Sequence, residues 1–401
     1  MDEFINADEH RAEVSGLIQE ICSLKNTLER KEKQLSEKNI ELLKNATADK
    51  KHPFDNPTDY KKYSGSYDII QPRLGEAGYK IPVEIDRVEF KNLKRQYSIG
   101  GWCIMLQFLM ALVLSLLLMS GVQLVMKVIN GGDGEASYKY MYGSSILVAI
   151  NMLVYIIANL TGAFAGLKWA GYKGKSLIKT RDFTFGKGLQ YCLIALFLWL
   201  VSVYSGTIVE LILNKFGLSC IVDQTGLGES PLGLAVGYVY TCIIAPVTEE
   251  IMFRGMVLKV FSRANQRFAI FASAFFFGLA HGNIPQFILA FVLGIFLAQI
   301  TMKHNSIIPA VIVHIFINTT STIFGLVTDK LEAYMLIATL ILFGAALVGA
   351  IMLLVFRSEG NRLPAPTPQQ HRRGRAVATS SVPFMLAATI QIIYMIHALV
   401  S

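Results

Sequence analysis

Two adjacent glutamates and an arginine lie within an apolar stretch long enough to cross a membrane. The stretch from Ala245 to Gly255 reads APVTEEIMFRG. Moving a carboxylate into hydrocarbon is costly unless the group is paired or faces water, so an ionisable residue at membrane depth indicates a functional site. Any chemistry that the chain performs is therefore expected to centre on this stretch.

The spacing of the three charged residues predicts different roles for the two glutamates. Glu250 and Arg254 are four residues apart, so on a helix they share one face and can neutralise each other. Glu249 points about 100° away from Glu250. The pattern predicts a structural pair of Glu250 with Arg254 and leaves Glu249 free for chemistry.

Two later apolar segments carry polar side chains that could act together with Glu249. Phe277 and His281 share a helix face in one segment, and His314 and Asn318 share a face in the other. A glutamate can take a proton from water, and one histidine can hold that water or a metal ion. The second histidine and the asparagine can donate hydrogen bonds to an oxyanion. These are the parts of a hydrolytic site.

Each of these residues also has a purely structural interpretation. A single histidine at the end of an apolar segment is often an interfacial or hydrogen-bonded core residue, and Asn318 can bond a neighbouring helix. Glu250 and Arg254 can form an architectural ion pair and nothing more. Only the combination favours a function, because keeping so many polar groups in one membrane interior for structure alone is costly.

The composition predicts an all-α polytopic membrane protein with about eight or nine transmembrane helices. Of the 401 residues 53% are hydrophobic, the mean hydropathy is +0.45, and the apolar residues form long uncharged runs. The helices are expected at Trp102–Val128, Ser144–Trp169, Gly188–Leu213, Leu232 to near Lys259, Phe268–Gly282, Gln286–Met302, Ser306–Val327, Ala333–Phe356 and Val382–Val400. The fifth is shorter than the ~20 residues of a full span. The last could also lie in the membrane interface.

The basic residues predict the orientation of these helices. The 37 Lys and Arg exceed the 29 Asp and Glu, and they gather at the ends of apolar runs. Positive residues favour cytosolic loops, so we expect an integral membrane protein with a cytosolic N-terminus. We favour a bacterial plasma membrane, with the endoplasmic reticulum as the alternative. The excess charge is explained by topology, and no nucleic-acid partner is expected. The five cysteines show no close pairing, which argues against a disulfide framework or a zinc knuckle.

The regions outside the transmembrane core, 99–357, have other compositions. Residues 1–46 predict a cytosolic coiled coil of about four heptads, which would form a homodimer or bind a partner coil through residues 14–43. Its a and d positions hold Val14, Leu17, Ile21, Leu24, Leu28, Lys31, Leu35, Lys38 and Leu42. The two lysines weaken the second half, so a solvated single helix is the alternative. Residues 47–98 are expected to form a cytosolic linker with little regular structure, and 358–401 a basic connector with a C-terminal apolar segment.

Three short motifs resemble those of the CPBP family when they are taken together and in order. They are Glu249-Glu250-x-x-x-Arg254, Phe277-x-x-x-His281 and His314-x-x-x-Asn318. The family includes the type II CAAX prenyl endopeptidases and related bacterial proteins such as bacteriocin self-immunity proteins. The resemblance covers about residues 97–355 and leaves out the coiled coil, the linker and the last apolar segment.

The resemblance implies an intramembrane endopeptidase whose cavity opens toward the cytosol. By their places in the motifs, Glu249 would activate the attacking water with His281, while His314 and Asn318 would stabilise the oxyanion. Arg254 would hold Glu250, with Phe277 as an orienting residue. We favour hydrolysis without a metal, because no His-Glu-x-x-His helix is present and a glutamate-activated water needs no ion. Zinc is the alternative.

Two hypotheses for the function follow. The first is an endopeptidase that cleaves a membrane-embedded or lipid-anchored protein or peptide near the cytosolic face. The second is a non-proteolytic scaffold or immunity protein that binds a sensor, transporter or receptor through its membrane core and coiled coil. The three intact motifs favour the enzyme, and the long N-terminal region favours the scaffold. The sequence identifies neither the substrate nor whether it is prenylated.

Overall fold

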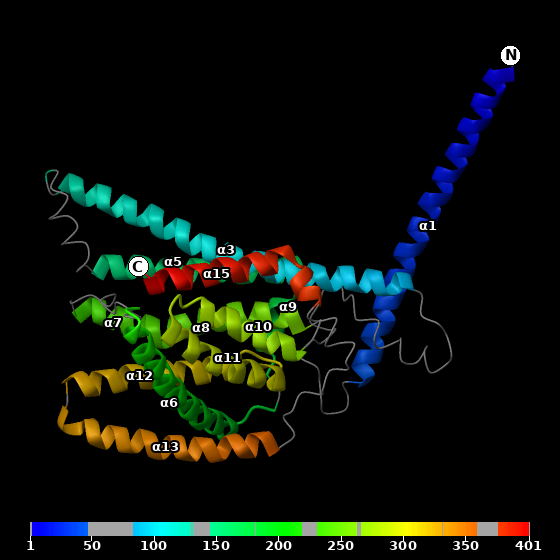
Figure 1. Cartoon of the computed structure of the whole chain (residues 1–401). Helices are drawn as coiled ribbons and strands as arrows, with labels where there is room; N and C mark the ends of the chain where they lie inside the picture. The colour runs from blue at the N-terminus through cyan, green and yellow to red at the C-terminus, as the bar shows by residue number, and fades with distance from the viewer. Residues whose placement is uncertain are drawn as a thin grey trace. The chain divides into compact units, whose positions relative to one another are not determined.

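The computed structural model describes residues 2–46, 83–129, 131, 145–180, 182–218, 231–262, 266–330, 332–358 and 376–400. Every regular element in these ranges is a helix (Figure 1). Because no sheet is present in them, the backbone polar groups are satisfied within helices, as a membrane interior requires. The predicted all-α class is confirmed.

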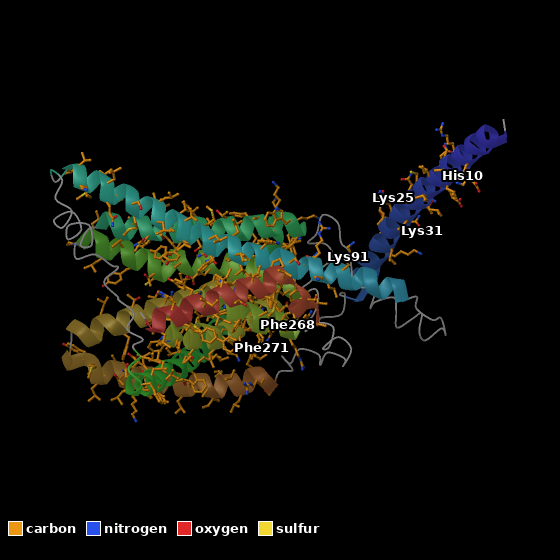
Figure 2. All side chains as sticks on the ribbon, turned by 45° about the horizontal axis from the view of Figure 1, so that its top comes forward. His10, Lys25, Lys31, Lys91, Phe268 and Phe271 are labelled. Atoms are coloured by element: carbon orange, nitrogen blue, oxygen red, sulfur yellow. The ribbon has the colours of Figure 1, made fainter. Side chains whose placement is uncertain are left out.

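The N-terminal helix α1 (Asp2–Ala46) is continuous over 45 residues and is described by itself. Its apolar a and d side chains in the first half are all exposed. They are Val14, Leu17, Ile21, Leu24 and Leu28, with between 47% and 63% of their surface accessible. Figure 2 shows Lys25 and Lys31 projecting from the same helix. The helix predicted from the heptads is present, whereas its pairing into a coiled coil stays a prediction.

Eight helices of the described residues are long and apolar enough to cross a membrane. They are α3 (Val83–Ile129), α5 (Ser145–Ala170), α6 (Phe185–Lys215), the composite helix from Pro231 to Ser262, α11 (Ile284–His304), α12 (Ile308–Lys330), α13 (Glu332–Ser358) and α15 (Val382–Val400). The fifth predicted segment forms α10 (Gln266–Leu279), which has 14 residues and is too short for a full span. The predicted number of helices and the short fifth one are both confirmed.

Helix α3 begins earlier than the sequence predicts. It starts at Val83, and its membrane-compatible part starts at Leu93, so residues 83–98 of the predicted linker are helical. The chain has no proline between Pro82 and Pro231, so nothing in residues 83–98 interrupts the helix that leads into the first span. The prediction of little regular structure is wrong for these residues, and the other residues of that linker lie outside the described ranges.

Two packed groups of helices enclose the segment that carries the glutamates. On one side α6, α11, α12 and α13 share an apolar core that includes Tyr191, Trp199 and Phe296. On the other side α3, α10 and α15 meet through rings, where Phe384 of α15 lies 5.7 Å from Tyr97 and 5.3 Å from Phe276 between centroids. The C-terminal apolar segment is therefore packed on the membrane core.

Helix α5 approaches its neighbours closely through a Gly-x-x-x-Gly pair. A Cβ atom at Gly162 would lie 2.9 Å from the Cβ of Gln107 on α3, and one at Gly166 would lie 2.5 Å from Met256. Pairs of small residues at this spacing let membrane helices pack backbone to backbone. Helix α5 thereby holds α3 close to the composite helix.

The composite helix from Pro231 to Ser262 departs from the α-helical hydrogen-bond pattern in two segments. It consists of α7 (Pro231–Val239), the π-helix η5 (Tyr240–Ile244), α8 (Ala245–Glu250), the π-helix η6 (Ile251–Leu258) and α9 (Lys259–Ser262). In η5 the Ala245 N–H donates to the Tyr240 carbonyl, five residues back. Pro246 follows at the start of α8 and has no N–H to donate. Both glutamates thus lie between two π-helical segments, which in proteins occur often at functional sites.

Candidate active site

Glu250 and Arg254 form an ion pair that is shielded from solvent. Arg254 Nη1 donates to Glu250 Oε1 over 2.8 Å, and both side chains are 0% exposed. Arg254 Nη2 also reaches the Gly294 carbonyl of α11 at 3.4 Å, and its guanidinium carbon lies 4.3 Å from the centre of the Phe277 ring. The arginine therefore joins the composite helix to α10 and α11.

Gly294 makes room for this arginine. A Cβ atom at that position would lie 3.2 Å from Arg254 Nη2 and 3.1 Å from Ala274. Because the residue has no side chain, α11 can approach α10 and offer its carbonyl to the guanidinium. Gly294 was not predicted as a site residue, since a glycine within an apolar run has many structural explanations.

His314 links the two glutamates across the helix interface. Its Nδ1 lies 2.9 Å from Glu250 Oε1, and its Nε2 lies 3.7 Å from Glu249 Oε2. The carboxylate of Glu250 is paired with Arg254, and an ionised carboxylate can only accept hydrogen bonds. Nδ1 of His314 therefore carries the hydrogen in this contact. This arrangement turns Nε2 of the imidazole toward Glu249.

Glu249 is the more accessible of the two carboxylates. Its side chain is 22% exposed, compared with 0% for Glu250. Of the two, Glu250 alone contacts Arg254 at ion-pair distance in the described residues. The predicted contact of Glu250 with Arg254 is present, and Glu249 is the carboxylate left outside that pair. The role of Glu249 in chemistry stays a prediction.

Phe277 lies at the centre of the site and touches both imidazoles. Its ring centroid is 5.1 Å from that of His281 and 5.6 Å from that of His314, both in an edge-to-face orientation. The Phe253 ring packs against it at 5.2 Å. The Arg254 guanidinium lies over the face of the same ring. Phe277 therefore packs against Arg254, His281 and His314 together.

His281 is positioned by its own helix. Its Nδ1 lies 2.8 Å from the Phe277 carbonyl, which can only accept, so Nδ1 carries the hydrogen and Nε2 presents a lone pair. No hydrogen bond or ion pair joins His281 to Glu249 in the described part of the chain. Phe277 contacts both His281 and His314, and His314 in turn faces Glu249. A water would have to bridge the gap between His281 and Glu249.

Asn318 satisfies a carbonyl that the proline leaves without a donor. Its Nδ2 donates to the Thr241 carbonyl over 2.9 Å. In the π pattern that carbonyl would accept from residue 246, but Pro246 has no N–H. One N–H of the amide is used in this way, and the second is available for a ligand. Asn318 was predicted as a site residue from its spacing to His314, whereas its bond to the Thr241 carbonyl was not predicted.

The donor atoms of the site bear on the choice between hydrolysis with and without zinc. A catalytic zinc centre uses three protein ligands. Here Glu250 Oε1 accepts from Arg254 and from Nδ1 of His314, while Glu250 Oε2 is buried without a partner in the described residues. Glu249 Oε2 and Nε2 of His314 face each other at 3.7 Å. No cluster of three or more His, Cys, Asp or Glu arranged for a metal occurs in the described residues. Hydrolysis without a metal stays a proposal.

A comparison with protein families places these residues in a known domain. Residues 231–320 match the family model described as type II CAAX prenyl endopeptidase Rce1-like. The membrane core of this chain carries an Rce1-like domain. The comparisons with curated proteins and with solved structures found no match.

The Rce1-like domain contains every predicted site residue. It runs from the start of α7 into α12 and holds all three motifs, and its family is one of CAAX-type intramembrane proteases. Helices α3, α5, α6, α13 and α15 lie outside the match. Of these, α5, α6, α13 and α15 nevertheless pack directly on the helices of the domain, and α3 contacts it through Tyr97, which stacks on Phe261.

Proposed function

We propose that this chain is an intramembrane endopeptidase that hydrolyses a peptide bond of a membrane-embedded or lipid-anchored protein near the cytosolic face. The observation that carries the proposal is the pair of adjacent glutamates in different surroundings. Glu250 is fully buried and held by Arg254, while Glu249 is partly exposed beside Nε2 of His314. A base for hydrolysis must be accessible to water, and Glu249 is the accessible one of the two carboxylates.

In the proposed reaction Glu249 takes a proton from water while the resulting hydroxide attacks the scissile carbonyl carbon. The Nε2 lone pair of His281 accepts a hydrogen bond from the same water and orients it. The carbon–nitrogen bond then breaks, and the proton held by Glu249 passes to the departing amine. Water is thereby divided between the new carboxylate and the new amine.

His314 and Asn318 are proposed to stabilise the oxyanion that forms at the carbonyl oxygen. His314 can do so when both ring nitrogens carry a hydrogen, so that Nδ1 donates to Glu250 and Nε2 donates to the oxyanion. Asn318 contributes the amide N–H that does not bond the Thr241 carbonyl. Donors fixed in a site that excludes bulk water stabilise such a charge strongly.

Comparing membrane-protein fragments across the proteome tests the activity and identifies the substrate together. Cells with the wild-type chain should contain terminal fragments that are missing from cells with Glu249→Ala, because the variant lacks the base. Glu210→Ala on α6 is the matched control, since this glutamate has no hydrogen bond or ion pair with a site residue in the described ranges. Identical fragments in the Glu249→Ala cells and the wild-type cells, with equal amounts of protein, would contradict the proposal.

The exposed apolar side of α1 favours a second candidate function, that of a membrane scaffold built on paired α1 helices. We commit to a second copy of the chain as the partner. Val14 and Ile21 at a with Leu17 and Leu24 at d are the residue types of parallel two-stranded coils. Glu20 at g would also face Lys25 at e of the second copy. Two copies in one membrane bring their N-terminal helices to a high effective concentration.

Full-length protein in membranes tests this pairing by cysteine cross-linking. Leu24→Cys in a Cys22→Ser chain should give a disulfide-linked dimer, whereas native Cys22, at the outer b position, should not. Ile21→Asp should abolish the cross-link and Ser23→Asp should leave it. As a scaffold, the protein should lose its cellular effect on deletion of residues 1–46 and keep it in Glu249→Ala, and the opposite result would reject the scaffold.

A further inference from the structure

A chain of buried polar side chains connects the accessory helices to the residue that precedes Glu249. Gln107 of α3 donates through Nε2 to Asn159 Oδ1 of α5 at 3.2 Å, and Asn159 Nδ2 donates to Thr248 Oγ1 at 3.4 Å. Thr248 in turn donates to the Ala245 carbonyl at 3.1 Å. The three side chains are 7%, 5% and 6% exposed, respectively. Gln107 and Asn159 lie outside the Rce1-like match.

The surrounding packing brings these side chains within hydrogen-bond distance. Gly162 lies one turn after Asn159, and any Cβ atom there would meet the Cβ of Gln107 at 2.9 Å. The close approach of α3 to α5 thus lets a glutamine and an asparagine bond directly. Buried hydrogen-bonded amides of this kind specify one arrangement of their helices, because each alternative leaves polar groups unpaired.

Contacts with neighbouring helices are needed to fix the rotation of α8 about its own axis. Glu249 and Glu250 are adjacent, so turning the segment by one residue, about 100°, would bring Glu249 to the place of Glu250. A regular helix on either side would set this rotation, but π-helices adjoin α8 at both ends. Arg254 and His314 hold one side of the segment. Thr248 offers the only side-chain hydrogen bond from α8 to α5 that the described residues contain.

We propose that Gln107, Asn159 and Thr248 are positioning residues that set the rotation of α8 and so decide which glutamate faces the water. They do not touch the reacting atoms. Their effect on catalysis rests on the proposed endopeptidase function, whereas their effect on the exposure of residue 249 does not. The active site thereby depends on two helices that are not part of its own domain.

A matched pair of substitutions at Thr248 tests this proposal. Thr248→Val keeps the shape and removes the hydroxyl, whereas Thr248→Ser keeps the hydroxyl. In peptide cleavage by the full-length protein, Thr248→Val should lower kcat about tenfold with KM unchanged, and Thr248→Ser should stay within about twofold of wild type. Asn159→Leu should resemble Thr248→Val. A change in KM alone, or equal losses in the valine and serine variants, would overturn the proposal.

A second measurement separates positioning from activity. Glu249→Cys places a thiol at the proposed base, and mass spectrometry of the peptide with residue 249 gives its rate of alkylation by a water-soluble maleimide. Adding Thr248→Val should lower that rate at least about threefold, because part of the population turns the residue away from water. Adding Thr248→Ser should not. An unchanged rate in the valine variant would reject the positioning role, even if the wild-type chain proved to have no protease activity.

Discussion

Glu249→Gln should lower kcat for peptide cleavage by a factor of about 10²–10⁴, the range expected on removal of a general base. Glutamine keeps the size of the side chain and most of its hydrogen bonding, but it cannot take a proton from water. Neither Arg254 nor the apolar packing depends on Glu249, so the amount of folded protein should stay the same. Initial rates with purified protein in lipid nanodiscs measure the effect.

Two further variants test whether the loss of activity comes from the missing carboxylate at position 249. Glu249→Asp retains a carboxylate and should recover part of the rate, while Glu210→Gln on α6 should have wild-type kinetics. A Glu249→Gln protein that cleaves within about threefold of wild type would show that another group, or none, acts as the base. The proposed mechanism would then have to be abandoned, although the Glu250–Arg254 pair would still be accounted for as structure.

Arg254→Leu should lower the free energy of unfolding by about 3–5 kcal/mol, because it leaves a buried carboxylate without its cation. Both partners are fully buried, and the guanidinium also binds the Gly294 carbonyl and covers the Phe277 ring. The loss should appear as poor expression or as a lower midpoint of thermal unfolding in detergent. Arg254→Lys should fall between leucine and wild type, since it keeps the charge but loses the fork that reaches Gly294.

The double variant Glu250→Gln with Arg254→Leu distinguishes an unpaired charge from lost packing. Its glutamine still accepts from Nδ1 of His314, and no buried ion is left unpaired. It should therefore be clearly more stable than Arg254→Leu alone. If the double variant is as unstable as the single one, packing of the guanidinium dominates, and the ion pair contributes little to stability.

The sequence predicted the helices well because lipid imposes a simple rule on them. Spanning segments must be about 20 apolar residues long, so their number and approximate ends follow from composition. The rule says nothing about polar segments outside the membrane, and there the prediction was wrong. Helix α3 begins at Val83, in a polar stretch that contains no long hydrophobic run. Coiled-coil pairing of α1 involves a second chain and stays open.

The candidate site was predicted where its geometry is local and missed where it depends on contacts between helices. The i,i+4 spacing is enough to pair Glu250 with Arg254, and the structure has this contact. No spacing within one segment indicates that His314 lies between both glutamates, or that Asn318 bonds Thr241. Gln107 and Asn159 are single amides in apolar runs, and nothing in the sequence connects them with the site. Their proposed role depends on the hydrogen bonds that link them to Thr248 in the structure.

The two π-helices that flank α8 make the helix unequally sensitive to changes in its length. Each π turn holds about one residue more than an α turn in nearly the same rise. Deleting one residue within Tyr240–Ile244 would let that segment close as an α turn, with the rotation of α7 relative to Glu249 nearly unchanged. Deleting one residue within the regular turn of α8 would instead rotate everything before it by about 100° and bring lipid-facing side chains into the interior. One-residue gaps in alignments of this helix should therefore fall in its π segments and not in α8.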